Sequence, residues 1–124
     1  MSRSLQANEA QEAQRASTIP VFTLEQPPGV EIRAVKGLVR GNTIRARHIG
    51  NDILAALKTL VGGEISEYTK MMAEAREQSL DRMRVEALHM GADAVVGVRF
   101  TTSTVMQGAA EILAYGTAVV IEKP

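Results

Sequence analysis

Residues 64–102 read EISEYTKMMAEAREQSLDRMRVEALHMGADAVVGVRFTT, and this stretch decides the fold. Positions 64–90 contain no glycine or proline and are rich in good helix formers, which predicts one long helix. Small and apolar side chains recur there at steps of three and four, as a single buried stripe requires. The members of this stripe are Tyr68, Met72, Ala75, Ser79, Met83, Ala87 and Met90. Gly91 suits the end of the helix, and positions 94–102 alternate as a strand does.

The flanking sequence adds further expected elements on both sides of this stretch. On the N-terminal side we expect strands at 19–24 and 31–41 and a short helix at 49–61, and on the C-terminal side a strand at 112–122. This order predicts an α+β fold of two layers, in which a small antiparallel sheet carries one short and one long helix on one face.

The first residues of the chain are polar and contain too little apolar surface to offset the entropy of ordering them. Helix propensity there is fair, but a short isolated helix is marginal in water. We therefore expect a flexible N-terminal tail over 1–18 and a single domain over 19–124.

Composition limits the possible chemistry. The 124 residues carry 14 basic and 14 acidic side chains, so the formal net charge is zero, and there is no cysteine. Disulfides, zinc-thiolate sites and thiolate nucleophiles are thereby excluded. The sequence shows neither a signal peptide nor an apolar span, so we expect a cytoplasmic protein. Neither a membrane nor nucleic acid is expected as a partner, because the chain lacks a strong overall field.

One metal site can be imagined from the sequence. His48 and Asp52 lie four residues apart, a spacing that puts two ligands of a divalent metal ion on one face of a continuous helix. Gly50 and Asn51 stand between them, however, which favours a solvated histidine before the helix and an aspartate that complements its dipole. The pair is kept as a candidate.

Three other residues are candidates for ligand binding. Arg45 and Arg47 end a run at 33–47 that holds five basic side chains and no acidic one, which would suit phosphate, although a solvated strand face explains it equally simply. Asp93 is the best-placed acid, at the expected helix-to-strand turn, where aspartate often has a structural role. No nucleophile stands with a base and an acid, so no catalytic residue is assigned and a non-enzymatic protein is favoured.

Self-association follows from the expected architecture. A small sheet leaves two edges with unpaired backbone groups, and a helix over 64–90 would be about 40 Å long, which exceeds the width of so small a domain. We expect copies of the chain to cover these surfaces.

Several motifs resemble those of the YbjQ-like family of small α/β proteins, labelled "putative heavy-metal-binding". The resemblance covers residues 19–122 and rests on these stretches: Gly62-Gly63, Tyr68, Ala75-Arg76-Glu77, GADAVVG at 91–97 and YGTAV at 115–119. It implies a dodecin-like subunit in a ring, a homopentamer, with no established enzymatic activity and structural roles for Gly91, Asp93, Gly97 and Gly116. The lack of cysteine departs from what soft-metal binding needs.

Two functions are therefore open for this chain. The leading one is a non-enzymatic ring whose pore or subunit clefts bind an ion or small ligand. The alternative is a heavy-metal-binding protein or metal-dependent enzyme that uses His48 and Asp52.

Overall fold

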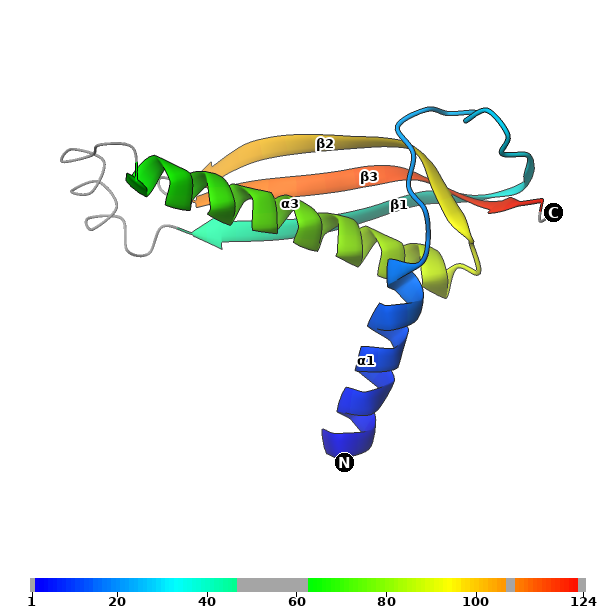
Figure 1. Ribbon diagram of the computed structural model, residues 1–124, viewed down its shortest axis with the longest axis horizontal. Helices are drawn as coiled ribbons and strands as arrows, with labels where there is room; N and C mark the ends of the chain where they lie inside the picture. The colour runs from blue at the N-terminus through cyan, green and yellow to red at the C-terminus, as the bar shows by residue number, and fades with distance from the viewer. Residues whose placement is uncertain (1, 47–62, 107–108, 123–124) are drawn as a thin grey trace.

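The computed structural model describes residues 2–46, 63–106 and 109–122 (Figure 1). The elements are α1 (Ser2–Ser17), β1 (Ile32–Ala46), α3 (Gly63–His89), β2 (Ala94–Met106) and β3 (Ala109–Ile121). The three strands form one antiparallel sheet in the order β1-β3-β2. In Figure 1, α3 runs along one face of the sheet while α1 projects away from both layers. The expected two-layer α+β architecture is confirmed for these elements.

The long helix and the strand after it begin where the sequence predicts, and α3 ends just before Gly91, which has a φ of +76°. The strands are longer than expected: β1 continues to Ala46 and β2 to Met106. At about 3.3 Å per residue the 15-residue β1 spans about 50 Å, so the sheet is as long as the helix. The length of α3 therefore does not by itself call for a second subunit.

The predicted strand at 19–24 is wrong, since only Val21 forms a bridge, parallel to Val95. The segment still follows the outer edge of β2 through four backbone hydrogen bonds. These are Val95 N to Pro20 O (3.0 Å), Phe22 N to Val95 O (2.8 Å), Gly97 N to Leu24 O (3.0 Å) and Val98 N to Phe22 O (2.9 Å). A bulge at Gly97, where φ is +62°, breaks the regular ladder, so no strand develops.

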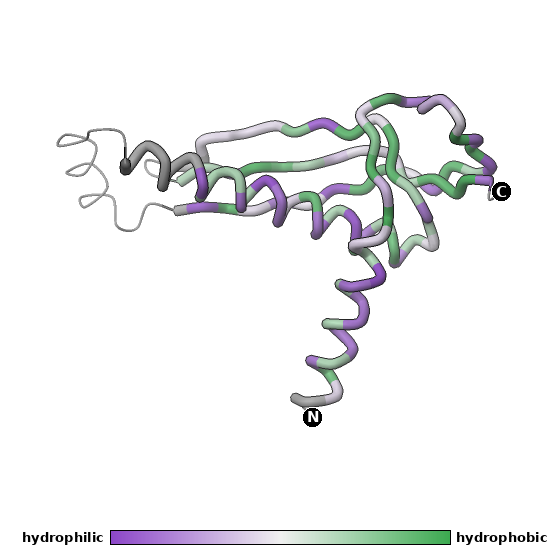
Figure 2. The backbone as a smooth tube through the Cα atoms, viewed as in Figure 1, coloured by the Kyte–Doolittle hydropathy of each residue, from purple (hydrophilic) through white to green (hydrophobic). Residues whose placement is uncertain are grey.

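The N-terminal segment is helical over Ser2–Ser17, although it was expected as a flexible tail. Figure 2 shows α1 as mainly hydrophilic, which is the property that the sequence predicted for this segment. Its flexibility and the division of the chain at residue 19 stay predictions. The expected short helix at 49–61 lies outside the described residues.

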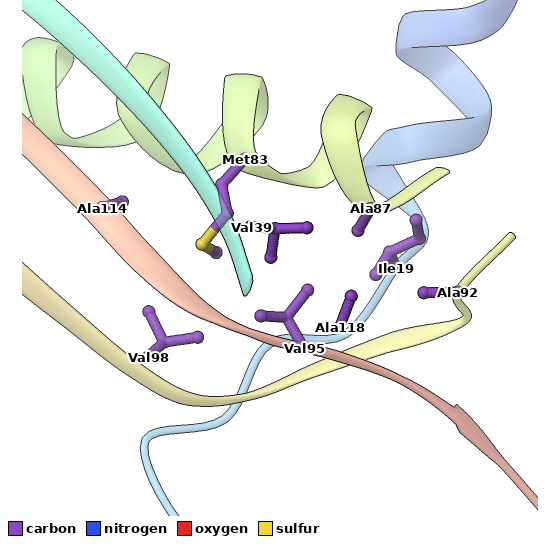
Figure 3. Close-up of a cluster of buried hydrophobic side chains, with 9 residues drawn as sticks. All are labelled: Ile19, Val39, Met83, Ala87, Ala92, Val95, Val98, Ala114 and Ala118. Atoms are coloured by element: carbon purple, nitrogen blue, oxygen red, sulfur yellow. The ribbon is translucent and has the colours of Figure 1, made fainter. Parts of the chain in front are cut away.

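The main core lies between α3 and the sheet. The buried stripe of α3 consists of Ala75, Ser79, Met83 and Ala87, and the residues of the core cluster are shown in Figure 3. Ile19, from the segment that follows α1, closes the cluster at the end of the helix. A second, smaller cluster lies on the other side of the sheet under the segment after Pro20; its members are Ala94, Val96 and Val119, with Phe22, Ile32 and Ile121 packed against them.

The helix rests almost directly on the backbone of β1. A Cβ added at Gly41 would lie 2.3 Å from the amide nitrogen of Met83 and 2.3 Å from the carbonyl oxygen of Ser79. These are backbone atoms, so the helix could not make room without moving as a whole.

We expect Gly41→Ala to lower the free energy of unfolding by about 3 kcal/mol, measured by urea denaturation, because overpacking against backbone cannot be relieved by a rotamer change. Gly29→Ala is the matched control: nothing lies within 4 Å of its added Cβ, and its φ of +80° alone should cost about 1 kcal/mol. Equal losses in the two variants would contradict the close approach.

Candidate functional site

Within residues 2–46, 63–106 and 109–122, backbone partners cover the two outer edges of the sheet over only part of their length. On β1, the amide of Arg40 donates to Glu86 Oε1 (3.0 Å), and the carbonyl of Asn42 accepts from Arg82 Nη1 (2.6 Å). Two side chains of α3 thus cap the outer edge of β1 at its middle.

The outer edge of β2 is covered only as far as Val98, which donates to Phe22. Because outward-pointing groups recur every second residue, the backbone groups of Phe100, Thr102 and Thr104 also point away from β3. Among the described residues, no segment pairs with these groups. By the same alternation the backbone of Ile44 points outward on β1, beyond the capped groups. An uncovered part of each edge therefore lies at the same end of the sheet, near the turn that joins β2 to β3. Among the described residues, the outer edge of β1 before Arg40 has no backbone partner either.

The face of the sheet opposite α3, called here the helix-free face, exposes apolar side chains. Leu38 is 60% exposed and Ile44 57% exposed on β1, and Tyr115 is 36% exposed on β3. At one end of this face lies an open hollow of about 480 Å³, bordered by Glu25 and Gln26 and floored by side chains that include Val96 and Thr117. The face is thus partly covered at one end and open at the other.

A row of three polar side chains crosses the helix-free face. Arg40 of β1 and Arg99 of β2 both stand opposite Tyr115 of β3 in the strand register. Arg99 Nη1 donates to the carbonyls of Thr23 (2.8 Å) and Val98 (2.9 Å), which ties the segment before β1 to the sheet. We call these three residues, Arg40, Tyr115 and Arg99, the Arg-Tyr-Arg row. Sequence reasoning missed it because Arg99 lies far from the basic run and only the register brings it to Arg40.

The basic run at 33–47 does not form one patch. Arg33 pairs with Glu122 at 3.2 Å, whereas Arg45 points to the α3 side and donates from Nη2 to Gln78 Oε1 at 3.2 Å. Arg45 Nε and the neighbouring Thr43 Oγ1 are buried without a hydrogen-bond partner. Arg47 lies outside the described residues, so ligand binding by Arg45 and Arg47 stays a prediction.

Asp93 has a structural position at the end of the sheet. Its Oδ1 accepts from the amide of Ile121 at 2.8 Å, and its own amide donates to the carbonyl of Val119 at 3.0 Å. These bonds fasten the start of β2 to the end of β3, as a turn acceptor does. Asp93 also borders an open hollow of about 460 Å³ with Arg15, so a ligand role stays a prediction as well.

A metal site finds little support in the part of the chain that the structure describes. His48 and Asp52 lie outside it, and within it no three His, Asp or Glu side chains gather as metal ligands. Met83, the thioether at the centre of the core, is fully buried against apolar neighbours. Among the described residues, a metal site is therefore built neither by a group of His, Asp and Glu side chains nor by Met83.

The second histidine joins two helices. His89 Nε2 lies 2.7 Å from Glu12 Oε2, so the last turn of α3 is linked to α1. Nearby, Arg84 Nε donates to the carbonyl of Ile19 at 3.1 Å, and Ala16 is buried. The partner of His89 could not be predicted from the sequence, because Glu12 belongs to the expected tail.

Comparisons with known proteins complete the description of the site. A family described as "Putative heavy-metal-binding" matches residues 19–122. A UPF0145 protein of Thermus thermophilus is 58% identical over 104 residues, 84% of this chain and 91% of that protein. A UPF0145 protein of Archaeoglobus fulgidus is 59% identical over 101 residues, covering 82% of this chain and 94% of that protein.

One solved structure gives the fold a counterpart. A protein of unknown function from the DUF74 family of Pediococcus pentosaceus matches with a TM-score of 0.55 at 17% identity, over 82% of this chain and 96% of that chain. At this identity the likeness concerns the fold alone. Among the described helices, none is both long and apolar enough to cross a bilayer.

Glu12→Gln should loosen α1 with little effect on global stability. An ion pair between partly exposed side chains contributes less than about 1 kcal/mol, so we expect amide hydrogen exchange in α1 to quicken by about twofold while the unfolding midpoint stays unchanged. Glu9→Gln, on the same helix and without a described partner, is the control. The same acceleration in both variants would show that the contact with His89 does not hold α1.

Proposed function

Because the chain belongs to the YbjQ family, described as putative heavy-metal-binding, we propose that it is a non-enzymatic protein that acts as a homo-oligomeric ring. The family resemblance implies five copies. The pore or the clefts between subunits then bind an ion or a small ligand. The cytoplasm is the compartment proposed for it.

The single observation that carries this proposal is the position of the uncovered edges. β1 and β2 are the two outer strands, and each offers outward backbone groups at the same end of the sheet. Pairing β1 of one copy with β2 of the next continues the sheet from subunit to subunit. Such a contact joins two different surfaces, and it closes into a ring when the rotation between neighbours allows.

The capped groups also fit this arrangement. Arg82 and Glu86 cover the β1 edge at Arg40 and Asn42, and the segment after Pro20 covers the first part of the β2 edge, as far as Val98. On β2, a neighbour would therefore be confined to the far end of the strand. Long uncovered edges would instead favour uncontrolled strand addition.

The assembly is tested by light scattering after size-exclusion chromatography. We expect a mass close to five times the 13.4 kDa of one chain. Thr102→Pro should yield a smaller species, because proline removes an outward amide from β2 without breaking the pairing with β3. Thr102→Ala keeps that amide and should leave the mass unchanged. A wild-type monomer at micromolar concentration would overturn the proposal.

The alternative function, a heavy-metal-binding protein or metal-dependent enzyme, is favoured by the family description. It would use His48 and Asp52 with a divalent metal ion. Copies of one weak ligand pair brought together around a ring could complete a coordination sphere that one chain does not supply.

Calorimetric titration of metal-free protein with zinc, nickel and copper tests this alternative. If the pair binds metal, His48→Ala should abolish most of the heat, whereas His89→Ala, which removes the other histidine, should leave it unchanged. Equal heats from the wild type and His48→Ala would exclude the pair.

A further inference from the structure

We propose that the Arg-Tyr-Arg row on the helix-free face binds a small oxyanion of the phosphate class. This inference rests on the proposed function, because it gives the small ligand of the ring a chemical class and a place. It differs from the phosphate site considered at Arg45 and Arg47, because the side chain of Arg45 lies on the side of β1 that faces α3.

The strand register brings the three side chains together. Directly opposed residues of neighbouring antiparallel strands have Cβ atoms about 5 Å apart, and Tyr115 has such a neighbour on each side. A guanidinium group carries five N–H donors and the phenol one O–H donor. The row therefore presents hydrogen-bond donors and two positive charges with no carboxylate between them.

The two arginines of the row differ in the partners that their guanidinium groups already have. The side chain of Arg40 is exposed and has no hydrogen-bond or ion-pair partner among the described residues. Arg99 Nη1 donates hydrogen bonds to the carbonyls of Thr23 and Val98, and these bonds hold the guanidinium in place. Its Nε and Nη2 have no described partner. A fork that is already oriented loses less entropy when it binds an oxyanion.

The row itself contains no carboxylate, but three lie near it. Glu86 Oε1 accepts a hydrogen bond from the amide of Arg40 at 3.0 Å, at the outer edge of β1. Glu111, two pairs further along β3, accepts a hydrogen bond from Asn42 Nδ2 at 3.0 Å. Glu25, on the segment before β1, packs over Gly97, with its Cγ 3.5 Å from where a Cβ would be. Glu25 has no described polar partner, so its charge should weaken anion binding from a distance.

The pairs that flank the row each combine a polar and an apolar side chain, so this part of the helix-free face is not a purely apolar surface. Leu38 stands beside Thr117 in the next pair on one side, and Asn42 beside Leu113 on the other. If the sheet continues from copy to copy as proposed, the row repeats at the same level in every subunit. The ligand would then meet several copies of the row around the ring.

Calorimetric titration with pyrophosphate, at low salt and at physiological salt, tests the inference on the assembled protein. We expect Arg40→Gln to weaken binding about tenfold, since charge-assisted hydrogen bonds are among the strong ones. Glu25→Gln should tighten binding about twofold, because a repelling charge is removed. Arg76→Gln removes an exposed arginine from α3 and should have no effect. Arg99 is left unchanged because it also holds Thr23.

The mass of every sample is measured by light scattering alongside the titration. If the wild-type ring binds no pyrophosphate, or if Arg40→Gln and Arg76→Gln weaken pyrophosphate binding equally, the inference is overturned and the proposed assembly still stands. If light scattering finds a monomer and the variants bind pyrophosphate in the expected order of affinity, the Arg-Tyr-Arg row is supported and the ring is overturned. Failure of Glu25→Gln to tighten binding would place the anion elsewhere and overturn the assignment.

Discussion

The close contact between α3 and β1 is the constraint on which the rest of the structure depends. The buried stripe of α3 is built mainly of small residues, and Gly41 lies beneath it, so helix and strand backbones almost touch. This position puts Arg82 and Glu86 within reach of the outer edge of β1, where they bind backbone groups that a more distant helix would leave exposed. Packing in the core therefore determines which part of the edge is available to a neighbour.

The two faces of the sheet have separate roles. The face under α3 contains the main core and, at its far end, the buried polar atoms of Thr43 and Arg45. The helix-free face carries a small cluster under the segment after Pro20 and then opens into a mixed apolar and cationic surface. Such a surface contributes little to the stability of one chain. Its chemistry suits contacts with copies of the chain and with small anions.

Much of this fold could be predicted from the sequence because its strongest signals are local. The absence of glycine and proline from 64–90 and the glycine at 91 gave the bounds of α3 to within a residue or two. The segment at 19–24 was misjudged because its pairing depends on a parallel neighbour and on the bulge at Gly97. The Arg-Tyr-Arg row and the contact of His89 with Glu12 could not be predicted, since each depends on residues that only the tertiary structure brings together.

The bulge in β2 decides what each face of the sheet displays. Gly97 and Val98 together stand opposite Gly116, so the extra residue shifts the alternation of side chains along β2. Val95 and Val98 both point into the main core as a result. Val95 packs closely against this point of β3, because a Cβ added at Gly116 would lie 2.9 Å from Val95 Cγ1. Regular alternation from Val95 to Phe100, without the bulge, would place Phe100 on the helix-free face and turn Arg99 toward the helix. The bulge at Gly97 thus selects a cationic rather than an apolar side chain for this part of the helix-free face, from the same set of residues.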